Sequence, residues 1–261
     1  MGYCAFSRSL ATVLNTQDIA QVCGAFAEHY GFEYFQYVEI LPTSLLEPQL
    51  LFINGFPSAW HDKYLSCDYL AIDPIVAHCT HHTLPVRWDE IAERYSERSV
   101  PGRMMMEARK HGLQCGFSIA VHQPGLALSI FSLASGNQAD AMRSRIQQAT
   151  PYTQLFGIEV QAAVRRILLS IQASADTAAK HLSERERQCL SLVAEGKTSG
   201  EAASILHIAE TTVVYHLQNA TRKLKASNRV HAVVKAIATG LIKPKVTSLT
   251  REMDVSIYQA R

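Results

Sequence analysis

The chain has no apolar run that approaches the length of a membrane span. A helix that crosses a bilayer needs about 20 consecutive apolar residues, and polar or charged residues interrupt this 261-residue sequence well before that length is reached. The N-terminal stretch MGYCAFSRSLATVLN also lacks the apolar core and small-residue cleavage site of a secretory signal peptide. These absences predict a protein without a membrane partner, located in the cytoplasm.

Paired cysteines are absent too, although the chain has six cysteines. Zinc sites and disulfide frameworks space their cysteines in regular patterns such as CxxC. Here they are scattered, at Cys4, Cys23, Cys67, Cys79, Cys115 and Cys189. We therefore expect reduced thiols and no metal site. The histidine-rich stretch 78–82 lacks a second group of ligands at a suitable spacing, which favours a solvated loop over a zinc site.

Catalytic signatures are also missing. The sequence contains no GxSxG nucleophile elbow and no HxHxDH-type metal motif. The N-terminal part lacks the alternating βα units, acidic pocket and phosphorylatable aspartate of a kinase-paired response regulator. An enzyme, such as a lactone hydrolase using Asp73 as a base, is therefore disfavoured, and no catalytic residue is assigned.

What the sequence does contain is ordinary globular material with an uneven charge. The chain is 48% hydrophobic and 18% charged, and its length suits one large domain or two ordinary ones. Residues 1–175 carry 12 Lys and Arg against 15 Asp and Glu, whereas residues 176–261 carry 13 against 8. The C-terminal third is therefore the better candidate for binding a polyanion.

The N-terminal part mixes helical and strand-like patterns. Residues 18–30 have apolar side chains at helical spacing, and the aromatic and β-branched residues 32–40 predict a strand. Residues 117–123 and 126–134 flank Pro124-Gly125 and predict a hairpin. A long helix over 138–170, interrupted near Pro151, should bury an apolar side made of Leu155, Ile158, Val164, Ile167 and Leu168.

Domain boundaries follow from these patterns. Residues 1–170 form the first predicted domain, and the small, polar stretch 171–181 is the predicted linker. Residues 182–242 form a helical domain, and residues 243–261 form a C-terminal tail with little pattern.

The helical domain has the order of a helix-turn-helix. Ser183 with Glu186 and Thr198 with Glu201 are two capping boxes, each of which opens a helix. A third, longer helix begins near Glu210 after a short turn, as in DNA-binding helix-turn-helix proteins. Its inward residues are Val213, Leu217, Ala220 and Leu224.

The outward side chains of that third helix suit DNA. Amide and guanidinium groups can read base edges, while Lys, Arg and Thr can contact phosphates. The candidate base-reading residues are Thr211, Val214, Tyr215, Gln218, Asn219 and Arg222. The candidate phosphate contacts are Lys197, Thr198, Thr212, Arg222, Lys223 and Lys225.

These residues resemble a known family. The segments LSERE from Leu182, EGKT from Glu195, TVVYH from Thr212, NATRKL from Asn219 and NR from Asn228 resemble the LuxR-type helix-turn-helix in order and spacing over about 60 residues. Two positions depart from it. Ala209 stands where the family usually has an N-capping serine, and Val214 where it often has a cation.

The N-terminal part is similar to the autoinducer-binding domain of LuxR-type quorum-sensing receptors. Trp60, Tyr64, Asp73-Pro74 and Trp88 are in the family's order, and the segment HGLQCGFSIAV at 111–121 matches too. The resemblance implies an α+β protein: an N-terminal α-β-α sandwich around an antiparallel sheet, and a C-terminal all-α, four-helix helix-turn-helix domain.

The resemblance implies an N-acyl-homoserine lactone as effector and no other cofactor. The Asp73 carboxylate suits the ligand's amide N–H, and the Trp60 indole N–H suits the lactone carbonyl. Trp88 and Tyr64 would provide flat walls. The family match places Ser132 near the amide carbonyl and gives Gly116 the role of leaving room for the ligand.

Two further positions bear on which ligand binds. Phe56 replaces a tyrosine found in many relatives, and Gln36 occupies a strand position that is often smaller. Both keep open an alternative in which the same DNA-binding regulator responds to a non-lactone molecule, or to none. The implied partners are a second copy of the chain, an inverted-repeat promoter site and, for an activator, RNA polymerase.

Overall fold

The computed structural model describes residues 2–41, 48–123, 126–175 and 182–243. The chain divides into two compact units, Met1–His181 and Leu182–Arg261. The predicted turn at Pro124-Gly125, the second half of the predicted linker and nearly all of the predicted tail lie outside the described residues.

The described residues of the first unit form one five-stranded antiparallel sheet. The strands lie in the order β2-β1-β5-β4-β3, and each neighbouring pair is antiparallel. This confirms the predicted antiparallel sheet. The strands are β1 (Tyr34–Leu41), β2 (Gln49–Asn54), β3 (Val86–Arg87), β4 (Cys115–His122) and β5 (Leu128–Ser135).

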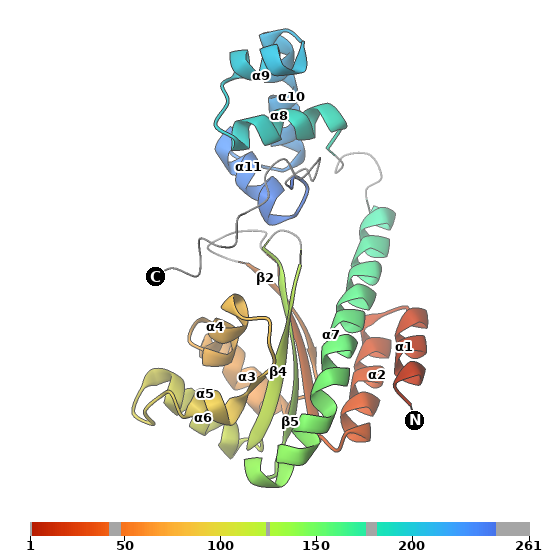
Figure 1. Cartoon of the computed structure of the whole chain (residues 1–261), viewed down its shortest axis with the longest axis vertical. Helices are drawn as coiled ribbons and strands as arrows, with labels where there is room; N and C mark the ends of the chain where they lie inside the picture. Colours follow the sequence, from red (N-terminus) through yellow and green to blue (C-terminus); the bar gives the residue numbers. More distant parts are fainter. Residues whose placement is uncertain (1, 42–47, 124–125, 176–181, 244–261) are drawn as a thin grey trace, which may run out of the picture. The chain divides into compact units, whose positions relative to one another are not determined.

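Helices cover both faces of this sheet, which confirms the α-β-α sandwich (Figure 1). Three helices lie on one face: α1 (Tyr3–Thr12), α2 (Thr16–His29) and α7 (Ala139–Ala175). The other face carries α3 (Ser58–Ser66), the 3-10 turn η1 (Tyr69–Ala71), α4 (Pro74–His81), α5 (Trp88–Ala92) and α6 (Val100–Lys110).

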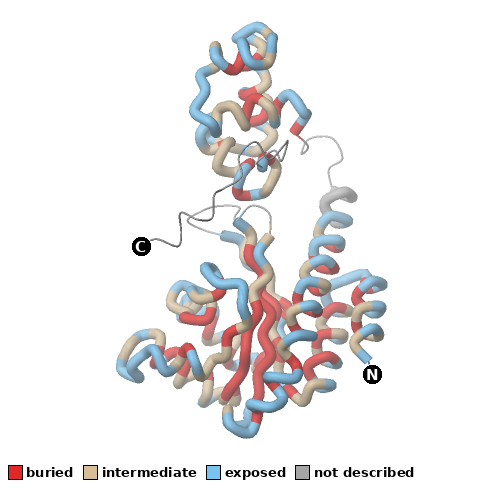
Figure 2. The backbone as a smooth tube through the Cα atoms, viewed as in Figure 1, coloured by how far each residue is buried: buried red, intermediate tan, exposed pale blue. Residues whose placement is uncertain are grey.

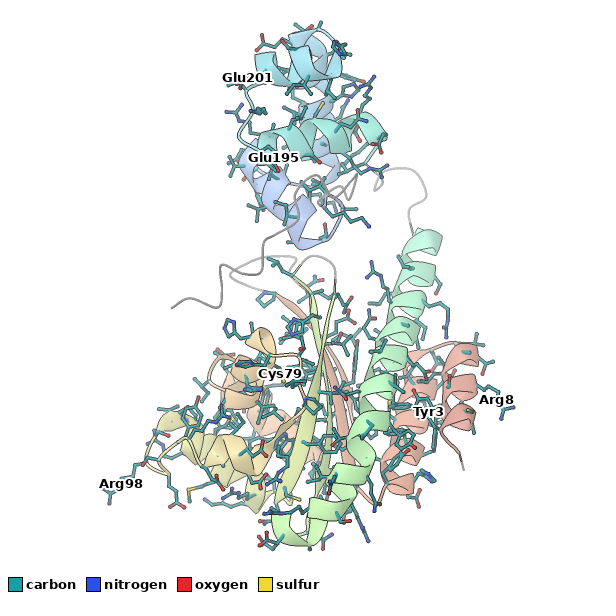
Figure 3. All side chains as sticks on the ribbon, in the orientation of Figure 1. Tyr3, Arg8, Cys79, Arg98, Glu195 and Glu201 are labelled. Carbon is teal, nitrogen blue, oxygen red and sulfur yellow. The ribbon has the colours of Figure 1, made fainter. Side chains whose placement is uncertain are left out.

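The period-two pattern of the strands creates two cores, one on each face. Phe35, Tyr37 and Phe131 belong to the core beneath α1, α2 and α7, whereas Val38 and Ile130 belong to the core beneath α3–α6. The strands β1, β4 and β5 are therefore buried along much of their length, whereas the edge strand β2 is not (Figure 2). Tyr3 of α1 and Cys79 of α4 lie on opposite sides of the sheet (Figure 3).

Helix α7 differs from its prediction in three ways. It passes through Pro151 without a break and continues to Ala175, into the predicted linker. Val164 and Ile167 are buried as expected, but Leu155 and Ile158 are 54% and 52% exposed. The prediction that these two face the core was wrong, because the helix packs through Phe156 and its neighbours on another face. Phe156 stacks on Phe26 of α2 with ring centroids 3.8 Å apart.

The histidine-rich stretch is also different from its prediction. Residues 78–81 form the last turn of α4 and do not form a loop. Cys79 is buried against the sheet, and the His78 and His82 rings stack with centroids 4.3 Å apart. Among the described residues, no group of three His, Cys, Asp or Glu side chains is placed to hold a metal ion.

Over its described residues, 182–243, the second unit contains four helices, as predicted. Its helices are α8 (Glu184–Ala194), α9 (Ser199–Leu206), α10 (Glu210–Lys223) and α11 (Arg229–Ala238). Both capping boxes are formed. Val213, Leu217 and Ala220 of α10 are buried, with Leu224 partly buried against the same core. In the described part of the chain, no helix is long and apolar enough to span a bilayer.

Candidate ligand pocket and DNA interface

A cavity lies between the sheet and the α3–α6 layer of the first unit. Seven of the eight predicted ligand residues line it: Gln36, Phe56, Trp60, Tyr64, Asp73, Trp88 and Ser132. They come from β1, the loop before α3, α3 itself, the cap of α4, α5 and β5. Residues more than 90 positions apart in the chain therefore line the same cavity, as they do in small-molecule binding sites.

Asp73 has both a structural role and a cavity-facing role. As the N-cap of α4, its Oδ1 accepts a hydrogen bond from the Ile75 backbone N–H at 2.8 Å, and its Oδ2 accepts one from the Tyr64 hydroxyl at 2.8 Å. Burial raises the pKa of the Asp73 carboxyl, and the bonds from Tyr64 and Ile75 act against the rise. Because a carboxylate accepts about four hydrogen bonds, Asp73 keeps capacity for a donor in the cavity.

An aromatic wall stands beside Asp73. Trp60 and Tyr64 are four residues apart on α3 and so lie on the same side of that helix. Their ring centroids are 5.9 Å apart, and Tyr69 lies 5.7 Å from Trp60. Trp60 is buried and lines the cavity.

A chain of hydrogen bonds fixes the opposite side of the cavity. The Trp88 indole N–H donates to Ser118 Oγ at 2.9 Å, and Ser118 Oγ lies 2.7 Å from Ser132 Oγ. This chain orients Ser132 and holds the Trp88 ring against the sheet. Ser118 was absent from the sequence prediction, although it stands directly opposite Ser132 in the β4–β5 register. The register of the predicted β4–β5 hairpin would have identified Ser118 from the sequence, because it pairs Ser118 with Ser132.

Gly116 does not line the cavity. A Cβ atom there would lie 2.6 Å from the Leu133 carbonyl oxygen and 2.9 Å from the Trp88 ring. The space that this glycine leaves is therefore taken by Trp88, whereas the sequence prediction gave it to the ligand. Gly116 shapes the site by letting Trp88 pack close to β4.

Several apolar lining residues were not predicted from the sequence. Met104, Met105 and Ala108 of α6, with Ile75 and Val76 of α4, line the cavity. Their apolar character was visible, but nothing in the sequence shows which apolar helix faces borders a cavity and which fills a core. Gln114 and Arg109 also line it.

The predicted DNA face lies on α10 and around the start of α9. Thr211, Val214, Tyr215, Gln218 and Arg222 are exposed, and Thr212 and Asn219 are half-buried. Lys197, Thr198 and Lys225 are exposed as well. The side chain of Thr198 caps α9 through its bond from the Glu201 backbone N–H, and Glu201 is labelled in Figure 3. The face is therefore open to solvent and carries amide and cationic groups.

Comparison with known proteins finds relatives for both units. A family model described as "Autoinducer binding domain" matches residues 15–164, and one described as "Bacterial regulatory proteins, luxR family" matches residues 180–236. The chain belongs to the LuxR family of transcriptional regulators. Its relatives in that family include the transcriptional activator AhyR of Aeromonas hydrophila, 31% identical over 90% of this chain and 90% of AhyR.

Other LuxR-family proteins match as fully. The transcriptional activator VanR of Vibrio anguillarum is 32% identical over 89% of this chain and 94% of its own. The crystal structure of Escherichia coli SdiA matches with a TM-score of 0.73 and 26% identity, covering 93% of this chain and 100% of that one. SdiA in complex with octanoyl-rac-glycerol matches with a TM-score of 0.74 and 25% identity, over 93% and 96% of the two chains. These relatives are regulators of transcription and not enzymes.

Ala209 weakens the start of α10 in this LuxR-family domain. It occupies the N-cap with extended backbone angles, and no side chain caps the helix there. An alanine at this position costs about 1 kcal/mol of helix stability relative to serine. The helix that presents the DNA face therefore depends more on packing than on its own cap.

Lys223 is directed toward the protein. Its ammonium lies 2.8 Å from Glu186 Oε2, and the Glu186 side chain is only 4% exposed. Burial tends to raise the pKa of Glu186, but Lys223 and the capping bonds of Ser183 outweigh it and hold that pKa below its ordinary value. This ion pair joins α8 to the end of α10, which differs from the phosphate contact predicted from the sequence.

Proposed function

We propose that this chain is a receptor for an N-acyl-homoserine lactone that, as a dimer, binds an inverted-repeat promoter site. The observation that carries the proposal is a cavity lined by Asp73, Trp60 and Ser132 together with apolar side chains such as Met104 and Ile130. It is supported by membership of a family with an autoinducer-binding domain.

The chemistry of such a lactone matches the groups around the cavity. Its amide N–H needs an acceptor, which the Asp73 carboxylate provides, and its two carbonyls need donors. Trp60 can donate to the lactone carbonyl and Ser132 to the amide carbonyl. Met104, Met105 and Ile130 give the acyl chain an apolar surface.

A second candidate ligand is an acylglycerol. SdiA, whose fold this chain shares, has been solved with octanoyl-rac-glycerol. Such an ester has hydroxyls but no amide N–H. The observation that favours this candidate is Asp73 at the cavity, because its carboxylate can accept from a glycerol hydroxyl as it would from an amide N–H.

The ligand class is tested by the thermal unfolding midpoint of protein expressed without ligand. We expect acyl-homoserine lactones of graded chain length to raise the midpoint with one optimal length, because a ligand that binds only the folded state stabilises it by mass action. Octanoyl glycerol is measured in parallel. A larger rise with the glycerol ester than with every lactone would overturn the lactone assignment in favour of the second candidate.

The proposed dimer uses an exposed apolar stripe on α7. Tyr152, Leu155, Ile158 and Leu169 are 45%, 54%, 52% and 56% exposed. The spacings of three, three and eleven residues place them on one side of the helix, away from the sheet. Large exposed apolar side chains that share a face mark an interaction surface.

Charge on this stripe should separate the dimer. We expect Leu155→Glu with Ile158→Glu to shift the ligand-bound protein from dimer to monomer in analytical ultracentrifugation, because each carboxylate would be desolvated at the interface. Leu65→Glu is the matched control, because Leu65 is 49% exposed on α3, across the sheet. A double variant that sediments as a dimer would remove α7 from the proposed interface.

The DNA-binding unit completes the proposed function. Two copies of α10 would read the half-sites of a pseudo-palindrome, with Gln218, Asn219 and Arg222 at base edges. For activation, RNA polymerase is the further partner. A regulator of this kind works on chromosomal DNA, which places its proposed action in the cytoplasm.

A further inference from the structure

The cavity face of the sheet carries one polar row between less polar ones. The strand register places Asn54 opposite Gln36, Gln36 opposite Ser132, and Ser132 opposite Ser118. Because residues in register lie side by side across a sheet, these four side chains form a line across β2, β1, β5 and β4. Three of them, Gln36, Ser132 and Ser118, line the cavity.

The rows on either side place no polar side chain at the cavity. Two residues along the strands, the next row is Phe52, Val38, Ile130 and Ala120. In the other direction, Tyr34 and Gly116 stand opposite Ala134 on its two sides, and neither of them lines the cavity. Among the sheet residues that line the cavity, an acyl chain therefore meets hydrogen-bonding side chains in one row only.

The β4 end of the polar row is already occupied. Ser118 Oγ accepts from the Trp88 indole and shares a hydrogen bond with Ser132 Oγ. A hydroxyl has one donor and two acceptor positions, so these two bonds use most of its capacity. With Ser132 assigned to the amide carbonyl, the remaining free capacity of the row lies on the β1 side, at Gln36.

Gln36 is held in place and keeps a donor and an acceptor for the cavity. Its Nε2 donates to Asn54 Oδ1 at 3.2 Å, and the same oxygen accepts from the Phe56 backbone N–H at 3.2 Å. A primary amide has two N–H donors and an oxygen with two lone pairs, so this bond leaves one N–H and the oxygen. The anchored amide can pair with a carbonyl or with a hydroxyl.

The position of Gln36 next to Ser132 points to the substituent that it would contact. Neighbouring strands lie about 4.8 Å apart. If Ser132 holds the amide carbonyl of an acyl ligand, a substituent two carbons further along the chain comes within reach of the Gln36 amide. We propose that Gln36 is a specificity residue that selects acyl-homoserine lactones with an oxygen on the third carbon of the acyl chain. This inference rests on the proposed function.

The test compares a matched pair of ligands, octanoyl- and 3-oxo-octanoyl-homoserine lactone, by their dissociation constants with the full chain. We expect the native protein to bind the 3-oxo form about threefold to tenfold more tightly, the range of one net hydrogen bond. Gln36→Leu should reduce that ratio to about one. Gln36→Met is a second variant of similar length, should leucine impair folding.

The control is Gln114→Leu, which also removes an amide side chain from the cavity lining but lies off the polar row. It should leave the 3-oxo preference unchanged. A native protein that binds both lactones equally, or a Gln36 variant that keeps the preference, would overturn the role of Gln36 while leaving the receptor assignment intact. A native protein that binds neither lactone would overturn the proposed function, and this inference with it.

Discussion

Asp73→Asn is expected to abolish most of the lactone-induced rise in the unfolding midpoint. In the native protein, Oδ1 accepts from the Ile75 N–H and Oδ2 from the Tyr64 hydroxyl. An asparagine that keeps the Ile75 bond places its NH2 group where Oδ2 was, so a donor would face the ligand's amide N–H. Losing a hydrogen bond to a charged group costs about 1.5–3 kcal/mol, which corresponds to roughly a 10- to 150-fold loss of affinity.

The same variant should not destabilise the unliganded protein at neutral pH. Burial raises the pKa of Asp73 above its value in the unfolded chain, so the buried charged form opposes folding. The stability associated with this group is fully present below the unfolded-state pKa and is lost as pH rises through the folded-state pKa. Asparagine does not titrate, so its advantage over aspartate should grow with pH across that window and then level off.

Both expectations are measured by thermal unfolding with and without lactone over a range of pH. Asp89→Asn is the control, because Asp89 also lines the cavity but its carboxylate is paired with Arg87. That variant should keep the lactone-induced rise. An Asp73→Asn protein that responds to lactone as the native protein does would remove the amide contact from the proposed binding mode.

The sequence predicted the architecture wherever one side of an element is buried. In β1, Tyr37 and Val38 face opposite cores, and this alternation follows directly from strand geometry. The capping boxes at Ser183 and Thr198 set the starts of α8 and α9 for a similarly local reason. Patterns with a period or a short fixed spacing can be interpreted without knowing the tertiary structure.

The details that were missed depend on partners far away in the chain. Nothing near Leu155 indicates that Phe156 and its neighbours, and not Leu155, will face the sheet. The Trp88–Ser118 bond joins residues 30 positions apart, and the Lys223–Glu186 bond joins residues 37 positions apart. Sequence spacing places a side chain on a face of its helix or strand, but its partner is decided by how the elements pack.

The Lys223–Glu186 pair gives the second large expected effect. Lys223→Met should lower the free energy of opening of α8 and α10 by about 3 kcal/mol, near the lower end of the range for removing one partner of a buried ion pair. The reason is that Glu186, 3% exposed, would remain charged in a buried position without its cation. Because Lys223 itself is 25% exposed, water that reaches Glu186 would offset part of the loss.

Hydrogen exchange of backbone amides in the full chain measures this opening helix by helix. Adding Glu186→Gln to Lys223→Met should recover part of the lost protection, since the unpaired charge is then removed. The pH dependence has a definite sign. Because the pKa of Glu186 is lower in the folded protein than in the unfolded chain, its ionisation stabilises the fold at pH values above the unfolded-state pKa. This stabilisation is lost as pH falls through the folded-state pKa. The Lys223→Met variant should lose that contribution.

DNA binding separates this structural role from a phosphate contact. Removing a lysine that neutralises a phosphate should reduce the slope of log K against log salt by about 0.9. Lys197→Met, at an exposed candidate phosphate contact, is expected to reduce the slope in this way without loss of protection in α8. Lys223→Met is expected to leave the salt slope unchanged and to reduce the protection of α8, because the Lys223 ammonium is engaged with Glu186. A reduced salt slope with unchanged protection in the Lys223 variant would restore the phosphate role and show that α10 is held in place by its apolar face alone.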